Sequence, residues 1–356
     1  MFLNSISLEG FRSFKSKTVF EFDPKFTLII GPNSVGKTNL LEGLYCLSYG
    51  HGFREKKLEE LVNQESKGFL LEAEFKNNDQ QIKIGVKYQY KSPLVTKTFF
   101  INQIRKSYRD FLKRTVSTVL FQPDDLLIVS HTPDLRRSYF DKTLMHTGFE
   151  YLEARRNYSG GLYKRNKLLE NLPKINQSEL VDLLRFWDNY LKKQALILQK
   201  IRREIVEDFN KHPALNGLEF KINYQPNLFL GVDEPGQLDQ ELKIRRTLSG
   251  PQLDEFVFLK LTDRKLKTLS RFGSRSEQRL FILWLKINEL RFIEEQTGQK
   301  PMLLMDDIFS ELDMKNSQRI LKVASAYQTV VTTAHQDILP LLKKNTSELN
   351  TITLNP

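Results

Sequence analysis

The stretch from Phe26 to Leu44 constrains the fold more than any other part of the chain. A short apolar run ends at Gly31 and an apolar-periodic helix resumes after Lys37, so strand, loop and helix follow in the order that a P-loop requires. Glycines let backbone N–H groups turn inward and cradle phosphate at the positive end of the helix dipole. The alternative is a glycine-rich turn that binds nothing.

This loop satisfies the pattern GxxxxGK[ST] and predicts a site for ATP and Mg²⁺. Lys37 would reach the β- and γ-phosphates, while the Thr38 hydroxyl would bind the Mg²⁺ that bridges them. The residues expected to contact the nucleotide are Gly31, Pro32, Asn33, Ser34, Val35, Gly36, Lys37, Thr38 and Asn39.

A second nucleotide motif is predicted at PMLLMDD, residues 301–307. A buried strand that ends in a carboxylate places it beside the phosphate loop, where it can hold Mg²⁺ and its water. Asp306 is therefore the candidate metal ligand, and Asp307 the candidate that orients or deprotonates the attacking water. The alternative is that the pair only caps the following helix or turn.

Most of the chain lies between these two motifs, which excludes a compact single-lobe nucleotidase. Strands and helices alternate on both sides of a helical middle, which predicts one α/β head formed by distant parts of the sequence. We assign residues 1–128 and 247–356 to this head and residues 129–246 to a mainly helical, basic lobe. The 356 residues, of which 40% are hydrophobic, are enough for such a division.

Alternating apolar patterns predict an antiparallel β layer and a set of buried strands. The layer is expected over residues 68–102, followed by a helix over 107–116. Further strands are expected at 6–14, 18–22, 26–30, 117–121, 218–224, 255–261, 301–306, 328–335 and 352–354, with helices at 276–296 and after SELD.

The middle region is predicted to contain a helix over residues 178–212, about 50 Å long at 1.5 Å per residue. Its apolar positions are spaced by four and three residues, which favours packing in a bundle. Gly160 and Gly161 interrupt the neighbouring helical pattern, and we expect a kink or a helix end there.

The net charge of +11 suits a polyanionic partner, although a solvated face is the alternative. Many basic residues fall in the helical middle, which favours nucleic acid. They include Arg136, Arg137, Arg155, Arg156, Lys164, Arg165, Lys167, Lys192, Lys193, Arg202 and Arg203.

The single cysteine, Cys46, excludes a disulfide framework and is expected to be a small buried thiol. No apolar run reaches the roughly 18 residues of a membrane span, and MFLNSISLEGF lacks the basic and apolar regions of a signal peptide. We therefore expect a cytoplasmic protein with no membrane partner.

Several motifs together resemble the bacterial RecF family of recombination-mediator ATPases, within the ABC and chromosome-maintenance superfamily. They are LEGFRSF, GPNSVGKTNLLEGL, FQPDDLLIVSHTPDLRRSYFD, KRNKLL, SRSEQR and LLMDDIFSELD, and they run nearly from end to end. The resemblance implies an ABC-like head with a helical second lobe. It also implies that ATP is held between two subunits of a head-to-tail dimer that closes on DNA.

The resemblance implies roles for five further residues. Arg12 would touch phosphate, the alternative being an exposed strand arginine, and Gln122 would contact Mg²⁺ and the attacking water, the alternative being a plain strand end. Ser274 would donate its hydroxyl to the γ-phosphate of the other subunit, and Asp313 would cross the dimer interface, with helix capping as the alternative for both. His335 would act as an H-loop histidine, or would be structural.

The motifs also depart from the family pattern. Ser276 replaces the signature glycine, and Glu277 stands where glutamine is usual, so an anion is expected to face the γ-phosphate. Ser34 replaces a P-loop glycine, and GPQLDE lacks basic and histidine residues of the matching motif. ATP binding is expected, whereas the rate of hydrolysis and the tightness of the dimer are open.

The first functional hypothesis is a DNA-repair ATPase of recombination and replication restart. It would bind double- and single-stranded DNA at gaps or junctions, act with RecR- and RecO-like mediators, aid recombinase loading and SOS induction, and hydrolyse ATP slowly to ADP and phosphate. The second is a DNA-binding scaffold in which ATP is a structural ligand. The third, a transport ATPase subunit, would need membrane features that the sequence lacks.

Overall fold

The computed structural model describes residues 1–55, 57–77, 80–91, 94–170, 177–215, 217–310, 312–334, 339–340, 342 and 349–355. It divides into two compact units, unit 1 with residues 1–125 and 289–356 and unit 2 with residues 126–288. The chain returns to unit 1 later than the expected residue 247, because β10 (Leu218–Gln225) pairs along its whole length with β11 (Glu255–Thr262). This pairing keeps the segment before helix α9 (Arg275–Thr297) in unit 2.

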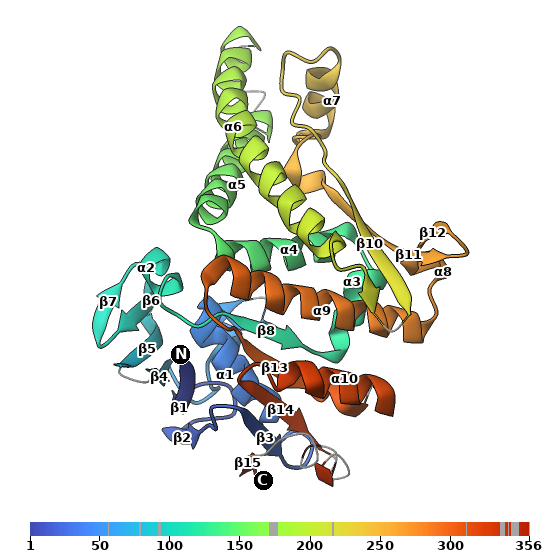
Figure 1. Ribbon diagram of the computed structural model, residues 1–356. Helices are drawn as coiled ribbons and strands as arrows, with labels where there is room; N and C mark the ends of the chain where they lie inside the picture. The colour runs from blue at the N-terminus through green and yellow to red at the C-terminus, as the bar shows by residue number, and fades with distance from the viewer. Residues whose placement is uncertain are drawn as a thin grey trace. The chain divides into compact units, whose positions relative to one another are not determined.

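A five-stranded sheet of parallel strands forms the centre of unit 1 (Figure 1). In spatial order its strands are β15 (Asn350–Thr353), β3 (Phe26–Ile30), β14 (Thr329–Thr333), β13 (Met302–Asp306) and β8 (Thr118–Phe121). Four of its strands, β3, β8, β13 and β14, are buried along nearly their whole length, as continuous apolar runs in parallel sheets are, whereas the edge strand β15 is partly exposed.

The predicted antiparallel layer is present in unit 1 as a second, six-stranded sheet. Helix α1 (Lys37–Tyr49) packs against strands of both sheets, and its residues from Leu40 to Tyr49 are all buried. The six strands, in spatial order, are β2 (Thr18–Glu21), β1 (Phe2–Glu9), β4 (Gly68–Asn77), β5 (Gln80–Lys91), β6 (Leu94–Ile101) and β7 (Ile104–Lys106).

Short helices complete unit 1. They are η1 (Leu58–Leu61), α2 (Tyr108–Leu112), η2 (Pro123–Asp125), η5 (Ile308–Ser310) and α10 (Met314–Ala324). Helix α2 ends earlier than the expected residue 116. Cys46 lies in α1 with no exposed surface, and burial raises the pKa of its thiol, which confirms the expected inert core cysteine.

Unit 2 is built on helices packed with a small antiparallel sheet of order β12-β11-β10-β9. Figure 1 shows α5 and α6 side by side as a long helical pair. The elements, besides those already given, are α3 (Leu126–Ser130), α4 (Pro133–Thr147), α5 (Phe149–Glu170), α6 (Gln177–Asn210), β9 (Ala214–Leu215), α7 (Gln237–Ile244), η4 (Pro251–Leu253), β12 (Lys265–Thr268) and α8 (Leu269–Phe272).

Helix α6 confirms the predicted long helix, and its apolar seam is buried at Leu180, Leu184, Leu191, Leu198 and Ile205. The expected break at residues 160 and 161 is wrong, because α5 continues through both glycines. A Cβ on Gly161 would lie 3.0 Å from Leu191 Cδ2 and 3.1 Å from Tyr190 Cδ1, both on α6. This glycine therefore lets the two helices approach each other closely.

Two arginines of the basic middle region are buried inside unit 2 rather than presented to a partner. Arg165 is fully buried and pairs with Asp188 at 2.6 Å and with Glu241 at 2.7 Å. Arg202 is 2% exposed and pairs with Asp141 at 2.6 Å and with Asp254 at 2.7 Å. A buried guanidinium needs such carboxylates, since an unpaired buried charge is costly.

Three more of these arginines also pair within unit 2. Arg136 binds Glu255, Arg155 binds Asp141, and Arg137 binds Asp134 and the carbonyl oxygen of Asp254. The members of the region that remain exposed are Arg156, Lys164, Lys167, Lys193 and Arg203. The surface available to an anionic partner is therefore smaller than composition suggested.

Candidate nucleotide site

The predicted nucleotide residues of unit 1 meet because four parallel strands end at one edge of the central sheet. β3 leads into the P-loop, β13 ends at Asp306, and β8 ends just before Gln122. Phe121 is in register with Met305, so Gln122 and Asp306 leave the sheet from neighbouring positions. In the sequence His335 comes two residues after the end of β14, and it lies outside the described residues.

The P-loop backbone requires glycine at two points. Gly36, the N-cap of α1, has φ +106°, and a Cβ there would lie 2.7 Å from Ser13 Oγ. A Cβ on Gly31 would lie 2.4 Å from the carbonyl oxygen of Leu354, which follows β15. Ser34 also has a positive φ of 67°, so the serine occupies a conformation that favours glycine.

Lys37 folds back over its own loop. Its Nζ donates hydrogen bonds to the carbonyl oxygens of Gly31 at 2.8 Å and Pro32 at 2.7 Å. Burial lowers the pKa of this ammonium, and the negative charges of Asp307 and Asp306 oppose that effect. A phosphate in the loop would offer stronger acceptors than these two carbonyls.

Asp306 is held by two hydroxyls from neighbouring elements. Thr38 Oγ1 donates to Asp306 Oδ1 at 3.0 Å, and Thr332 Oγ1 donates to the same atom at 2.6 Å. Burial raises the pKa of Asp306, while these two hydrogen bonds and the positive charge of Arg54 act in the opposite direction. Thr332 was not predicted as a site residue, and its position one residue before the end of β14 was the only available signal.

A hydroxyl and a carboxylate on one site fit Mg²⁺, which prefers oxygen ligands and usually completes its shell with waters and substrate phosphates. Among the described residues no group of three or more His, Cys, Asp or Glu side chains could hold a metal. The pair Thr38 and Asp306 would suit a metal ion that arrives with a nucleotide.

Asp307 has two features that are typical of functional residues, a strained backbone and a buried oxygen that no described residue satisfies. Its φ is +50°, in the left-handed region, and its backbone N–H donates to the carbonyl oxygen and the hydroxyl of Thr332 at 3.2 and 3.1 Å. Its Oδ1 is buried and accepts no hydrogen bond from the described residues. Strained residues and unpaired buried acceptors are concentrated at functional sites.

Arg12 lies in the turn after β1, with φ +49°. It is therefore not a strand residue, and it is only partly exposed. Its guanidinium binds the buried carboxylate of Glu42 in α1, at 2.7 and 3.1 Å. Glu42 also binds Arg54, which in turn donates to the Asn39 side chain at 2.8 Å. Arg54 is a cation beside the P-loop that sequence analysis missed, because a loop arginine has no distinguishing pattern.

Two predicted residues of the dimer interface cap helices. Asp313 is the N-cap of α10, and its side chain accepts from the backbone N–H of Asn316. In unit 2, Ser274 forms a capping box before α9, in which Ser274 Oγ accepts from the N–H of Glu277 at 3.3 Å and Glu277 Oε2 accepts from the N–H of Ser274 at 2.7 Å. Both side chains are exposed, so capping leaves them accessible to a ligand.

Glu277, which was expected to place an anion before the γ-phosphate, is paired with a cation. Lys260 of β11, which is 7% exposed, donates to both carboxylate oxygens of Glu277 at 2.7 and 2.8 Å. Although partial burial would raise the pKa of Glu277, the hydrogen bonds from Lys260 and Ser274 hold it below its ordinary value. The negative charge at this position is thus balanced within the subunit.

Comparisons with known proteins agree with this geometry. The family model described as RecF/RecN/SMC N terminal domain matches residues 2–351. The DNA replication and repair protein RecF of Acetivibrio thermocellus is 30% identical over 95% of this chain and 94% of that protein. RecF of Natranaerobius thermophilus is also 30% identical, over 95% of this chain and 92% of that protein.

Solved structures extend the likeness to three dimensions. A structure described as the recombination mediator protein RecF-ATP in the RecFOR pathway matches with a TM-score of 0.83 at 29% identity, covering 94% of this chain and 92% of that one. An Smc head domain from Pyrococcus furiosus, at 15% identity and a TM-score of 0.53 over 99% of this chain and 94% of that one, shares the fold alone. With its P-loop, paired aspartates and ABC-type head, the chain belongs to the RecF family.

Proposed function

We propose that this chain is an ATP-dependent DNA-binding protein of recombinational repair and replication restart, with slow ATP hydrolysis. The observation that carries the nucleotide part is the Asp306 carboxylate, which lies against Thr38 of the P-loop, next to an Asp307 oxygen that has no hydrogen-bond partner among the described residues. The names of the relatives, which refer to replication, repair and ATP, support the rest.

Each side chain of the site has a defined task in this proposal. Lys37 exchanges two loop carbonyls for phosphate oxygens, and Thr38 and Asp306 hold Mg²⁺. Mg²⁺, when bound, supplies charge that offsets the phosphates. Asp307, with Gln122 beside it, positions water and accepts its proton, while Arg54 and Arg12 keep the P-loop helix in place through Glu42.

The finer assignments are part of the same proposal. DNA would be bound at single-strand gaps or junctions, as duplex and single strand, by a cytoplasmic homodimer that forms with ATP and works with RecR- and RecO-like mediators. Ser274 and Asp313 would act across that dimer, and His335 would act as an H-loop histidine. Among the described residues no helix is both long and apolar enough to cross a membrane.

The scaffold hypothesis, in which ATP is only structural, rested on an anion facing the γ-phosphate. The pairing of Glu277 with Lys260 removes that electrostatic argument. We therefore favour ATP hydrolysis. A rate of ATP hydrolysis no higher than that of a no-enzyme control would instead support the scaffold hypothesis.

Fluorescence anisotropy of a labelled gapped duplex tests the proposal directly. Affinity should rise with ATP and Mg²⁺, and Lys37→Ala should abolish that increase while the fold, followed by circular dichroism, is unchanged. Five phosphate contacts would give a slope near −4.5 in a plot of log affinity against log salt. Equal binding with and without nucleotide, or no salt dependence, would contradict it.

Mixing two inactive variants tests the shared site. If Ser274 serves the nucleotide of the other subunit, Lys37→Ala and Ser274→Arg each inactivate a homodimer, yet a heterodimer keeps one intact site. Mixed one to one, with time for exchange, they should recover about a quarter of wild-type turnover if sites act independently. Verified heterodimers whose intact site binds no ATP would exclude the assignment of Ser274 to the opposite subunit.

A further inference from the structure

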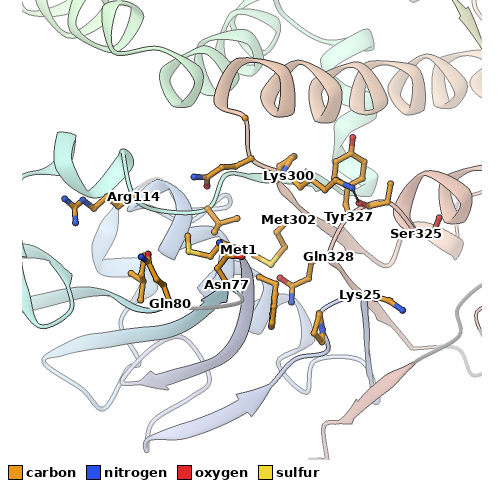
Figure 2. Close-up of a pocket in the computed structure, with 18 of the residues that line it drawn as sticks. Met1, Lys25, Asn77, Gln80, Arg114, Lys300, Met302, Ser325, Tyr327 and Gln328 are labelled. Atoms are coloured by element: carbon orange, nitrogen blue, oxygen red, sulfur yellow. Dashed lines mark hydrogen bonds between the residues drawn. The ribbon is translucent and has the colours of Figure 1, made fainter.

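Unit 1 contains a cavity of about 740 Å³ at the edge of the central sheet where the parallel strands begin (Figure 2). Its lining residues Met302 and Val116 are only 2% and 4% exposed, so they belong to the core of the unit. In unit 2, by contrast, the helical pair α5 and α6 presents large aromatic side chains to solvent. Tyr163 of α5 and Phe186 of α6 are each 64% exposed.

The aromatic residues of α6 lie together on one face of the helix. Trp187 packs edge to face with two neighbours, with ring centroids 5.2 Å from Phe186 and 5.8 Å from Tyr190. Lys164 of α5 places its Nζ 5.1 Å from the centre of the Trp187 ring, so both helices contribute to one surface. We call these four residues and Tyr163, which precedes Lys164, the aromatic face. A group of large apolar side chains that stays exposed marks a binding surface.

Acidic residues are nearly absent along the aromatic face. Residues 154–169 of α5 and 183–203 of α6 include a single one, Asp188, which is 3% exposed and bound to Arg165 at 2.6 Å. Residues 171–176, which join the two helices in sequence and are not described, include no Asp or Glu. No exposed carboxylate of these stretches therefore opposes the cations beside the rings.

Three of those cations are exposed and have no acidic partner. Arg156, Lys164 and Lys193 form no ion pair within the described part of the chain. The acidic residues at the ends of the two stretches, Glu170 and Asp182, each pair with a basic neighbour on their own helix. The positive charge of the aromatic face is therefore available to an anionic ligand.

Gly160 lies on the same side of α5, one helical turn from Arg156 and one from Lys164. A Cβ on this glycine would meet no atom of the described chain within 4 Å, so packing does not require its small size. Glycine inside a helix is destabilising relative to alanine, and it commonly marks a place where a ligand approaches the backbone closely. The gap at Gly160 would let a phosphate or a sugar lie against α5 between the two cations.

Exposed rings beside unpaired cations suit single-stranded nucleic acid, whose bases stack on aromatic side chains while its phosphates bind the cations. We propose that the aromatic face binds single-stranded DNA, with bases stacked on Tyr163 and Phe186 and phosphates against the three cations. A duplex keeps its base faces stacked inside and would leave the rings in water. An apolar protein partner would cover the rings but bury cations without counter-charges, which is costly. This inference rests on the DNA binding proposed above and assigns its single-strand part to α5 and α6.

Anisotropy of a fluorescein-labelled 20-nucleotide oligothymidine, measured on the full chain with ATP and Mg²⁺, tests the proposal. The ring variant, Tyr163→Ala with Phe186→Ala, should bind it at least tenfold more weakly, because each lost stacking contact lowers affinity several-fold. An abasic strand of the same length should bind the ring variant and the wild type equally. The matched control, Tyr90→Ala with Ile104→Ala, removes two exposed apolar side chains from unit 1 and should leave affinity unaltered.

A second variant, Arg156→Ala with Lys193→Ala, should act through the phosphates. In a plot of log affinity against log salt, its slope for the single strand should be less steep by about 1.4, at about 0.7 for each phosphate contact. Its control is Lys221→Ala with Lys265→Ala, two exposed lysines of unit 2 with the same change in charge, which should leave the slope unchanged.

Unchanged affinity of the ring variant for oligothymidine would overturn the proposal and leave the exposed rings to a partner protein. An equal loss in the matched control, or an equal loss on the abasic strand, would overturn it too, because neither depends on stacking. ATP-dependent binding of a blunt 20-base-pair duplex by the ring variant should equal that of the wild type. A wild type that binds DNA no better with ATP would instead contradict the proposed function, so the two failures are distinguishable.

Discussion

Two aspartates, one in each unit, have opposite surroundings. Asp141 of unit 2 lies among Arg202, Arg155 and Tyr151; burial alone would raise its pKa, but the two guanidinium groups hold it below its ordinary value. Within the described part of the chain, the Asp306 side chain of unit 1 accepts from two hydroxyls, and burial raises its pKa. The charge of Asp141 is neutralised by guanidinium groups of its own unit, whereas Asp306 is the residue that we propose for holding a cation.

The same contrast applies to the neighbours of these residues. The carboxylate of Asp254 in unit 2 accepts from Arg202, Gln199 and the N–H of Asn227. Asp307 in unit 1 has a buried oxygen to which no described residue donates, and it occupies a strained conformation. A carboxylate whose oxygens all have partners is therefore interpreted as structural. A carboxylate with an oxygen that lacks one is interpreted as part of the nucleotide site.

Replacement of Asp254 and of Asp307 should give the largest effects, the first on stability and the second on ATP turnover. Asp254→Ala should lower the free energy of unfolding by about 3–5 kcal/mol, because Arg202 stays buried with one carboxylate fewer. Asp307→Asn should change it by less than about 0.5 kcal/mol, since Asn tolerates a positive φ, and should slow ATP turnover by about 10²–10⁴-fold. Urea titration and phosphate release measure the two quantities.

A control for Asp254 is Glu170→Ala, which removes an exposed pair with Lys167 and should cost less than about 1 kcal/mol. If Asp307→Asn also unfolded the protein, the distinction between structural and functional aspartates would fail.

Acidification should disable the nucleotide site before it weakens unit 2. The lowered pKa of Asp141 means that its ion pairs stabilise fully above its unfolded pKa of about 3.9 and are lost as the pH falls through the lower folded value. The raised pKa of Asp306 means that the folded protein takes up this proton above about pH 3.9, and a protonated carboxyl binds Mg²⁺ poorly. Affinity for Mg²⁺-ATP should therefore fall at a higher pH than the unfolding transition.

Thr332→Val isolates this effect from the titration of ATP itself. Loss of the 2.6 Å hydrogen bond should raise the pKa of Asp306 further and move the midpoint of Mg²⁺-ATP binding to higher pH. A midpoint that does not move would show that Asp306 is not the titrating group.

Local patterns were sufficient to predict most strands, the P-loop and the meeting of Thr38 with Asp306, although β1 runs over Phe2–Glu9 and the expected strand at residues 6–14 ends in a turn. Each of these follows from short apolar runs and from the rule that parallel strands end together. The pairing of Arg165 with Asp188 and Glu241 joins three helices, and sequence spacing contains no information about such partners. The basic middle was for this reason assigned too completely to DNA.

The same limit explains two other differences. Gly161 looked like a helix breaker because its role, close packing against α6, is visible only in three dimensions. The partner of Glu277 was not foreseen because Lys260 reaches it from β11, and strand β12 and helix α8 separate β11 from Glu277 in the sequence. Sequence position identified the residue but not its partner.

Glu277→Gln should now weaken the fold rather than speed the chemistry. Gln keeps the capping contact to Ser274 but leaves the ammonium of Lys260, which is 7% exposed, without a carboxylate, at a cost of about 1–3 kcal/mol. Adding Lys260→Met should recover part of the loss, a coupling that a double-mutant cycle measures by urea titration. Faster ATP turnover in the single variant would instead return Glu277 to the γ-phosphate.

The smallest expected effect distinguishes strain in the P-loop from packing in the helical pair. Ser34→Gly removes a left-handed Cβ cost of about 1–2 kcal/mol and adds about 0.4–1 kcal/mol of unfolded-chain entropy. A net gain of about 0.5 kcal/mol in the free energy of unfolding should result, measured by urea titration. Gly36→Ala, at φ +106° and against Ser13 Oγ, is the matched control and should lose stability. Gly161→Ala in unit 2 gains helix propensity of about 1 kcal/mol but meets Leu191 at 3.0 Å, so it should gain less than propensity predicts. If Ser34→Gly also left ATP affinity unchanged, the strain at Ser34 would belong to the fold of the loop alone, whereas a weaker affinity would show that the strained serine helps to shape the phosphate site.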